Sequence, residues 1–189
     1  TIAAPDEVEA AAEAARSFDI PVCATMSFDS AGRTMMGLTP RAFAGLAEDF
    51  NLDGFGANCG VGASDLMSSV LGFADAQPTA PVIAKANCGI PHYDEGEIVY
   101  SGTVEQMAAY AQLARAAGAK IIGGCCGTKP EHVAAMRKAL DENDQPDFRV
   151  LAIELALGKM SDGARQIAIG QDALKNSTRR SGGNRRRKG

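Results

Sequence analysis

Apolar residues recur along this chain in short continuous runs that alternate with longer amphipathic segments. Runs rich in β-branched and small apolar residues cover 20–28, 52–59, 81–88 and 119–126. They start about 30 residues apart, a spacing typical of repeated strand–helix units. Each run ends in polar or cysteine residues followed by a loop. We therefore expect parallel strands whose carboxyl ends meet at one edge of a sheet.

Helix signals lie between these runs. Serine and threonine side chains satisfy the free N–H groups of a first helical turn, and proline lacks the N–H that would be left over there. Segments with such signals begin near Pro5, Thr39, Ser64, Thr103 and Thr128. Strands that alternate with helices at this spacing predict an α/β fold of the (β/α)8 TIM-barrel type, with four strand–helix units in this chain.

Composition divides the chain into three parts. Residues 1–145 contain the strand–helix units, and residues 146–174 form a C-terminal extension that we expect to pack on the barrel. Within the extension, 148–157 is apolar enough to be either a strand or a docked helix. Residues 175–189 contain seven lysines and arginines and no acidic residue, so we expect a disordered basic tail.

The overall composition is that of a globular protein. Of the 189 residues, 46% are hydrophobic and 22% are charged, and the net charge is −4. No stretch approaches the roughly 20 apolar residues of a membrane helix, and the N-terminus has no signal-peptide pattern, so we expect a cytoplasmic protein. Without the basic tail the chain is acidic, which argues against a nucleic-acid-binding domain. The tail by itself is suited to an electrostatic contact with an acidic partner.

The sequence Gly-Gly-Cys-Cys-Gly-Thr at 123–128 carries the strongest chemical signal. Clustered cysteines in a cytosolic protein more often bind metal or react than form structural bridges. The flanking glycines allow backbone conformations that turn the sulfurs of Cys125 and Cys126 toward one point. The amino end of the predicted helix that follows favours thiolates. Zinc binding, a vicinal disulfide and two buried thiols are the alternatives for this pair.

Two strand ends offer a third thiol. Cys59 lies in Gly-Ala-Asn-Cys-Gly at 56–60, and Cys88 lies in Ala-Asn-Cys-Gly at 86–89. The residues alone do not separate these two candidates. Three thiolates leave one tetrahedral position open, which is typical of a catalytic zinc. The remaining cysteine, Cys23, is expected in the core, where free cysteines are common.

Together these motifs resemble the zinc-binding pattern of the homocysteine S-methyltransferase family, which includes betaine-homocysteine methyltransferases and the homocysteine domain of cobalamin-dependent methionine synthase. Residues 84–91 are similar to the family's Lys-Pro-Asn-Ala-Gly-Leu-Pro stretch, and 26–34 are similar to its fifth strand and the loop that follows. The resemblance covers roughly residues 1–140. It implies that the chain holds the C-terminal half of a homocysteine-binding barrel.

The resemblance implies that Cys59, Cys125 and Cys126 bind one Zn²⁺ and that Cys88 does not. It further implies methyl transfer to the thiol of homocysteine, giving methionine, with the zinc-bound substrate thiolate as nucleophile. The methyl donor is then a small onium compound or a methylated corrinoid. The alternative is a non-catalytic zinc or redox-sensing module that uses the vicinal cysteine pair.

Three polar residues at strand ends are candidates for contact with the substrate, namely Ser27, Asn58 and Asn87. The family also has a glutamate at the end of its fourth strand, which the resemblance places against the homocysteine amine, and this residue is absent here. Four strand–helix units cannot close an eight-stranded barrel and leave two open edges. We therefore expect a fragment of a longer protein, or a second chain in a homo-oligomer or other complex that completes the barrel.

Overall fold

The computed structural model describes residues 2–142 and 144–170 and is built around a parallel β-sheet. The predicted alternation of strands and helices is confirmed, and each strand is shorter than the apolar run that contains it. In the described residues the sheet order is β1-β2-β3-β6, with β1 at Cys23–Met26, β2 at Gly54–Cys59, β3 at Val82–Ala86 and β6 at Ile121–Gly124.

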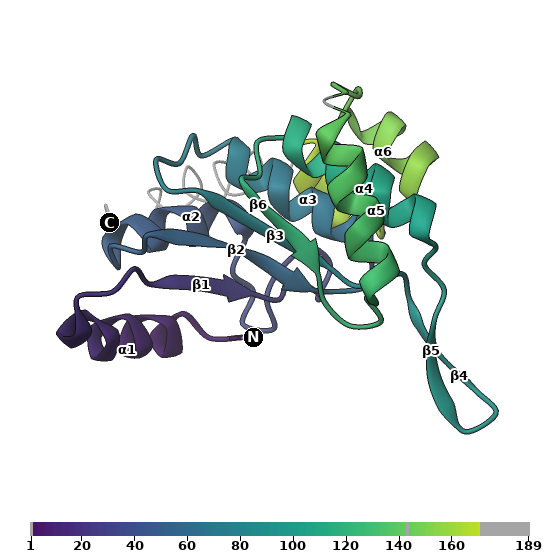
Figure 1. Ribbon diagram of the computed structural model, residues 1–189. Coiled ribbons are helices and arrows are strands. Elements are labelled where there is room, and N and C mark those ends of the chain that lie inside the picture. The colour runs from purple at the N-terminus through teal and green to yellow at the C-terminus, as the bar shows by residue number, and fades with distance from the viewer. Residues whose placement is uncertain (1, 143, 171–189) are drawn as a thin grey trace, which may run out of the picture.

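Helices cover one face of this sheet. Figure 1 shows α3, α4 and α5 standing above the strands, while α1 lies at the edge of the sheet, next to β1. A short 3-10 turn, Arg16–Phe18, follows α1. The helices with their bounds are α1 (Pro5–Ala15), α2 (Pro40–Asp49), α3 (Ala63–Ala74), α4 (Val104–Ala116), α5 (Pro130–Asp141), α6 (Val150–Leu157) and α7 (Asp162–Ala168).

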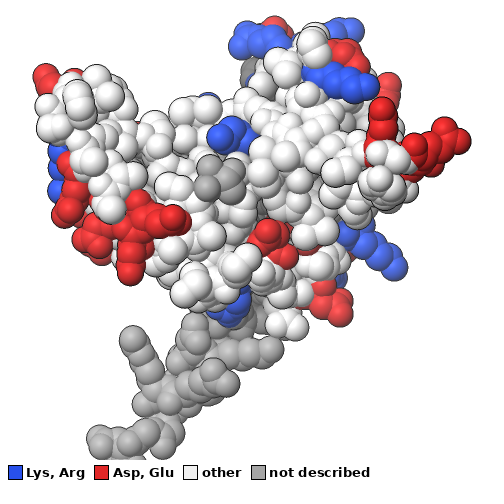
Figure 2. Space-filling model, turned by 90° about the horizontal axis from the view of Figure 1, so that it is seen from below, with Lys and Arg blue, Asp and Glu red and all other residues white. Residues whose placement is uncertain are grey.

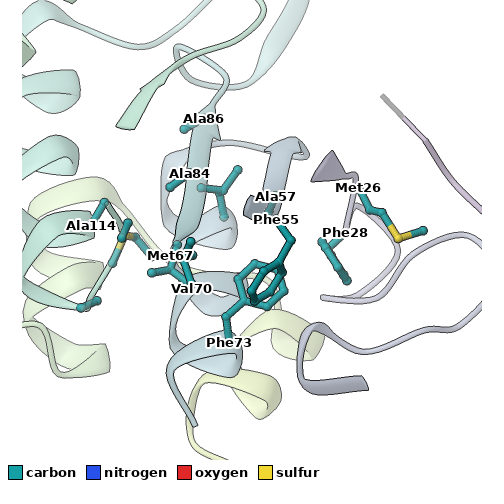
Figure 3. Close-up of a cluster of buried hydrophobic side chains, with 14 of the residues drawn as sticks. Met26, Phe28, Phe55, Ala57, Met67, Val70, Phe73, Ala84, Ala86 and Ala114 are labelled. Carbon is teal, nitrogen blue, oxygen red and sulfur yellow. The ribbon is translucent and has the colours of Figure 1, made fainter. Parts of the chain in front are cut away.

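The core lies between the sheet and these helices, where four phenylalanine rings meet edge to face. The ring of Phe55 on β2 lies 5.2 Å from that of Phe73 on α3 and 5.8 Å from that of Phe43 on α2. Phe28 adds a T-shaped contact with Phe73 at 5.7 Å. Figure 3 shows this cluster beside the small residues of β3, which let α3 approach the sheet closely.

The starts of the helices confirm some predicted caps and contradict others. The hydroxyl of Thr39 accepts the N–H of Ala42, and Thr103 forms the predicted capping box with Gln106. The prediction for Ser64 is wrong, because Gly62 is the cap, α3 begins at Ala63 and the Ser64 hydroxyl donates to the Lys159 carbonyl of the extension. Thr128 is not a cap either, since α5 begins at Pro130 after Lys129.

A β-hairpin that we did not predict separates β3 from α4. It consists of β4 (Pro91–Asp94) and β5 (Glu97–Tyr100), and Figure 1 shows it projecting beyond the carboxyl ends of the sheet strands. Its turn residues, Glu95 and Gly96, both have positive φ, at 45° and 97°. Two left-handed residues in a row match the twist of a tight hairpin, and the Glu-Gly pair was the signal in the sequence.

The extension after the strand–helix units is helical. The apolar segment 148–157, left open between strand and helix, contains α6. The Asp65 carboxylate of α3 accepts hydrogen bonds from the N–H and the hydroxyl of Ser161, which caps α7. This contact ties the extension to α3. The predicted basic tail, 175–189, lies outside the described residues, so the division of the chain into three parts stays a prediction.

The underside of the sheet carries few charges. Figure 2 shows acidic side chains on the left, toward α1, and on the right, toward the hairpin, with a mainly uncharged surface between them. Among the described residues no strand pairs with the outer edge of β6, and β1 carries only a parallel bridge from Ile2 to Met26. No helix in the described ranges has the length and apolarity needed to cross a bilayer.

Candidate metal centre

The register of the sheet aligns the ends of three strands. Cys59 is paired with Ala86, and Ala86 is paired with Gly124, so β2, β3 and β6 end at one level. The N–H of Cys125 then donates to the Ala86 carbonyl at 2.7 Å, which continues the sheet by one residue. This register brings two cysteine motifs that are far apart in the sequence to one edge.

The three cysteines that the family resemblance selects lie together at this edge. The sulfur atoms of Cys59, Cys125 and Cys126 all lie within 4.8 Å of one another. The Cys59 and Cys125 sulfurs are 2.8 Å apart, and those of Cys125 and Cys126 are 4.0 Å apart. The closest pair therefore joins two loops, and this arrangement gives no support to a redox cycle confined to the vicinal pair.

Backbone conformation explains how Cys59 reaches this cluster. Along β2 side chains alternate between the two faces, and Phe55 and Ala57 face the helices, so an extended Cys59 would face them too. Its φ of 58° is left-handed instead, as is the φ of 78° at Gly60. A left-handed conformation costs a non-glycine residue about 1 kcal/mol or more. Strain at a residue with a reactive side chain is typical of functional sites.

Asn87 holds the two cysteine-bearing loops together. Its side-chain oxygen accepts the N–H of Cys126 at 3.1 Å, and its amide nitrogen donates to the Gly60 carbonyl at 2.8 Å. The side chain is 6% exposed. Both polar atoms of the amide are thus hydrogen bonded to the backbone. The oxygen bonds to the predicted ligand Cys126, and the nitrogen bonds to Gly60, the neighbour of the predicted ligand Cys59. Asn87 links the loop after β2 to the loop after β6 from the end of β3.

Cys88, the rival candidate, points away from the cluster. Its side chain is 1% exposed, and its sulfur lies 3.3 Å from Nε2 of His132 on α5. Nδ1 of His132 accepts the N–H of Lys129, so the proton of the neutral ring is on Nε2 and is donated to the sulfur. Burial raises the pKa of the Cys88 thiol. The structure thus separates two cysteines with nearly the same local sequence.

The thiol of Cys125 favours the neutral state while no cation is present. Burial, the hydrogen bond with Cys59 and the nearby Cys59 and Cys126 sulfurs raise the pKa of Cys125 to about 11. A divalent cation reverses this effect, because it stabilises the thiolate form of each ligand. Proton release should therefore accompany any metal that binds here.

The other predicted site residues lie near this edge. Ser27 follows β1, and its hydroxyl donates to the backbone carbonyl of Asn58 at 3.2 Å. Asn58 itself is buried at the end of β2. Their contact with substrate stays a prediction, as does that of Asn87. Cys23 is exposed, which contradicts the prediction that it lies in the core. Its position at the start of edge strand β1 explains the difference.

Two further residues near the cluster were not predicted. His132 occupies the third position of α5, where its ring reaches both the helix start and Cys88. Tyr100 ends β5, and its ring lies against Gly127, the residue after the cysteine pair. The Glu-Gly pair could have indicated the hairpin, but no pattern in the sequence places Tyr100 beside the loop of Cys125 and Cys126.

Comparison with known proteins gives the chain a family. The family model for homocysteine S-methyltransferase matches residues 1–140. The methionine synthase of Mycobacterium tuberculosis (strain ATCC 25618 / H37Rv) is 28% identical over 132 residues, which are 69% of this chain and 11% of that protein. That of Mycobacterium leprae (strain TN) is 28% identical over 122 residues, which are 64% of this chain and 10% of that protein.

Solved structures share the fold. The homocysteine methyltransferase MmuM from Escherichia coli in its apo form has a TM-score of 0.56 and 23% identity, covering 74% of this chain and 48% of MmuM. Its metallated form has a TM-score of 0.55 and 22% identity, covering 72% and 42%. The chain thus spans less than half of these structures and about a tenth of the methionine synthases. By its sequence match, this chain belongs to the homocysteine S-methyltransferase family.

Proposed function

We propose that this chain carries the zinc-binding half of an enzyme that transfers a methyl group to the thiol of homocysteine and so forms methionine. The observation that supports this most directly is the meeting of the Cys59, Cys125 and Cys126 sulfurs within 4.8 Å at the carboxyl ends of parallel strands. Active sites of barrels built from strand–helix units lie at this end. The family match supports the same reaction.

The cluster fits zinc in the chemistry and spacing of its donors. Thiolates are preferred zinc ligands, and bonds of about 2.3 Å in a tetrahedron hold two sulfurs about 3.8 Å apart. The distance of 4.0 Å between the Cys125 and Cys126 sulfurs is close to this value. The Cys59 sulfur lies closer to Cys125 and would move away by about 1 Å to share a zinc ion. Three protein sulfurs leave the fourth position for a substrate.

The chemistry that zinc supplies when bound is to lower the pKa of the homocysteine thiol, so that it reacts as a thiolate at neutral pH. The thiol proton is released to solvent. The substrate sulfur forms a bond to the methyl carbon while the bond from that carbon to the donor breaks, and the donor leaves with the electron pair. An onium compound or a methylated corrinoid carries a methyl group electrophilic enough for this step.

The residues of this chain prepare the site for that reaction. Asn87 holds the two loops at a fixed separation, and the left-handed Cys59 directs its sulfur away from the core. Ser27 and Asn58 lie at neighbouring strand ends, where we propose that they contact the amino-acid part of the substrate. Fixed positions for the ligands and the substrate reduce the entropy cost of reaching the transition state.

We further propose that other strands close the sheet into a barrel. The parallel bridge from Ile2 to Met26 shows that the outer edge of β1 accepts a parallel neighbour. Ile121 on β6 is partly exposed at the other end of the sheet. The missing strands come from another part of a longer protein or from a second chain. Light scattering after size-exclusion chromatography tests the second case, since a monomer would exclude a self-completed barrel.

Metal analysis of the reduced protein tests the site. We expect about one zinc per chain in the wild type, as three sulfur ligands at one centre require. Cys59→Ser should lose the metal, whereas Cys88→Ser should keep it. Cys88 is a matched control, because it has the same Asn-Cys-Gly context but its sulfur contacts His132. No zinc in the wild type, or loss only with Cys88→Ser, would refute the proposed centre.

X-ray absorption at the zinc edge then separates a catalytic centre from a non-catalytic one. Added homocysteine should raise the number of sulfur ligands from about three to about four, because its thiol takes the open position. Homoserine, which has a hydroxyl in place of the thiol, is the control and should leave the sulfur number unchanged. A zinc shell that does not change with homocysteine would favour a structural or redox role.

A further inference from the structure

Three consecutive residues at the end of β3 hold the vicinal cysteines. The Ala86 carbonyl accepts the N–H of Cys125 at 2.7 Å, and the Asn87 side chain accepts the N–H of Cys126 at 3.1 Å. The N–H of Cys88 donates to the Cys126 carbonyl at 2.9 Å. Both backbone groups of Cys126 are therefore bonded to the residues that follow β3, so the direction of its side chain depends on where Cys88 lies.

A buried contact with α5 fixes the side chain of Cys88. The Cys88 sulfur lies 3.3 Å from Nε2 of His132, and the two residues are 1% and 7% exposed. The N–H of Lys129 donates to Nδ1 of the same ring at 2.9 Å. Both ring nitrogens thus have a partner, and a rotation of the ring would break one bond or both.

These bonds hold the loop 126–129 at its first and its last residue. The Cys126 carbonyl is bonded to Cys88, the Lys129 N–H is bonded to His132, and Cys88 and His132 contact each other. Gly127, inside the loop, has a φ of 75° and restrains the backbone little, because it has no Cβ. A loop held at both ends has less conformational freedom to lose when one of its residues binds a metal.

We propose that His132 is a positioning residue of the metal centre, which holds Cys88 and the start of α5 in place and so fixes the direction of the Cys126 sulfur. This inference rests on the proposed function, because it assumes that Cys126 is a metal ligand. His132 acts through Cys88 and Lys129 and not as a ligand itself. Residues that orient metal ligands in this way generally raise the affinity for the metal.

The proposal gives Cys88 a role without a bond to the metal. Its sulfur accepts the ring N–H of His132, while its backbone N–H holds Cys126. A serine at position 88 still offers an oxygen that can accept the ring N–H, so Cys88→Ser should keep the metal. An alanine there leaves Nε2 of His132 without a partner in a buried place, so Cys88→Ala should weaken metal binding.

His132→Ala and Gln106→Ala form a matched pair for the test. Each removes a side chain that accepts the N–H of the residue before its helix, which is Lys129 in one case and Thr103 in the other. His132→Ala also removes the contact with Cys88. His132→Gln is the conservative variant, because its amide can accept the Lys129 N–H and donate to Cys88. Zinc affinity of the reduced proteins is measured by competition with a chelator, and thermal unfolding of the metal-free proteins shows that each variant is folded.

We expect His132→Ala to bind zinc at least about 10-fold more weakly than the wild type, whereas Gln106→Ala and His132→Gln should bind it as the wild type does. The melting temperature should fall in both alanine variants, because each loses a helix cap. A purely structural role for His132 would lower the melting temperature in the same way but leave the zinc affinity unchanged.

Cys88→Ala tests the contact by itself, because it keeps the ring of His132 and the cap on α5, and it serves even if His132→Ala does not fold. It should also weaken zinc binding. The double variant should bind zinc no more weakly than His132→Ala, since both substitutions remove the same contact. Wild-type affinity in Cys88→Ala or in His132→Ala, or losses that multiply in the double variant, would overturn the inference while leaving the metal centre intact. A wild type that binds no zinc would overturn the proposed function, and this inference with it.

Discussion

Asn87→Ala is the substitution that should most directly show how the cysteine loops are held. It removes a hydrogen bond of 3.1 Å from the Cys126 N–H and one of 2.8 Å to the Gly60 carbonyl. Alanine supplies no replacement for either bond. Both bonds are made by a side-chain amide that is itself buried.

The magnitude follows from these two bonds. A typical intramolecular hydrogen bond contributes about 1 kcal/mol net, and a buried partner left without one costs about 1–3 kcal/mol. Cys126 is exposed and Gly60 is half-buried, so water can reach both backbone groups after the substitution. We therefore expect a loss near the lower end, about 2 kcal/mol of unfolding free energy. For a chain of this size that is a fall in melting temperature of about 4–8 °C.

Urea unfolding of the metal-free protein and zinc competition measure the two consequences separately. Gln112→Ala is a suitable control, because it removes a single side chain–backbone bond, 3.2 Å long, from Gln112 to the Ala139 carbonyl. It should cost about 1 kcal/mol and leave zinc affinity unchanged. Asn87→Ala should also weaken zinc binding at least about tenfold. A stability loss below about 0.5 kcal/mol, or equal zinc affinities in the two variants, would refute the role of Asn87 as a link between ligand loops.

Three other predictions concern the core, a close backbone contact and pH. Phe73→Ala should cost about 3–5 kcal/mol in urea unfolding, because the fully buried ring meets Phe28, Phe43 and Phe55; a loss under 1 kcal/mol would contradict this packing. Gly102→Ala should destabilise the protein by about 1–3 kcal/mol or more and lower its melting temperature, because the added Cβ would overlap the backbone of Cys88. The pKa of Cys125 is raised from 9.0 to about 11, so the folded metal-free state holds its proton more tightly than the unfolded chain. Its stability should therefore fall as pH rises from about 9 to about 11, and urea midpoints that are flat across this window, or the same in Cys125→Ser, would contradict it.

Much of the architecture follows from local patterns. The apolar runs at 20–28, 52–59, 81–88 and 119–126 contain the four sheet strands because β-branched and small residues suit a sheet covered by helices. Thr39 and Thr103 begin helices because their hydroxyls satisfy N–H groups of the first turn. The cysteine motifs could be placed at strand ends for the same reason, because they form the last residues of those runs.

The choice between Cys59 and Cys88 could not be made in that way. Both follow an asparagine and precede a glycine at the end of a strand. The left-handed backbone of Cys59 turns its sulfur to the cluster, whereas His132, reached from α5, holds the sulfur of Cys88 in the core. The short motif around each cysteine does not determine the φ of Cys59 or the contact of Cys88 with a residue 44 positions away.

Contacts between distant segments account for the other features of the site. Asn87 joins Gly60 to Cys126, and Tyr100, at the end of a hairpin whose two strands pair with each other, lies against Gly127. Each of these contacts depends on the register of β2, β3 and β6, which is set by packing of the whole sheet against its helices. The residue types and the order of elements are local properties of the chain. The directions of the side chains at the metal centre arise only when those elements pack together.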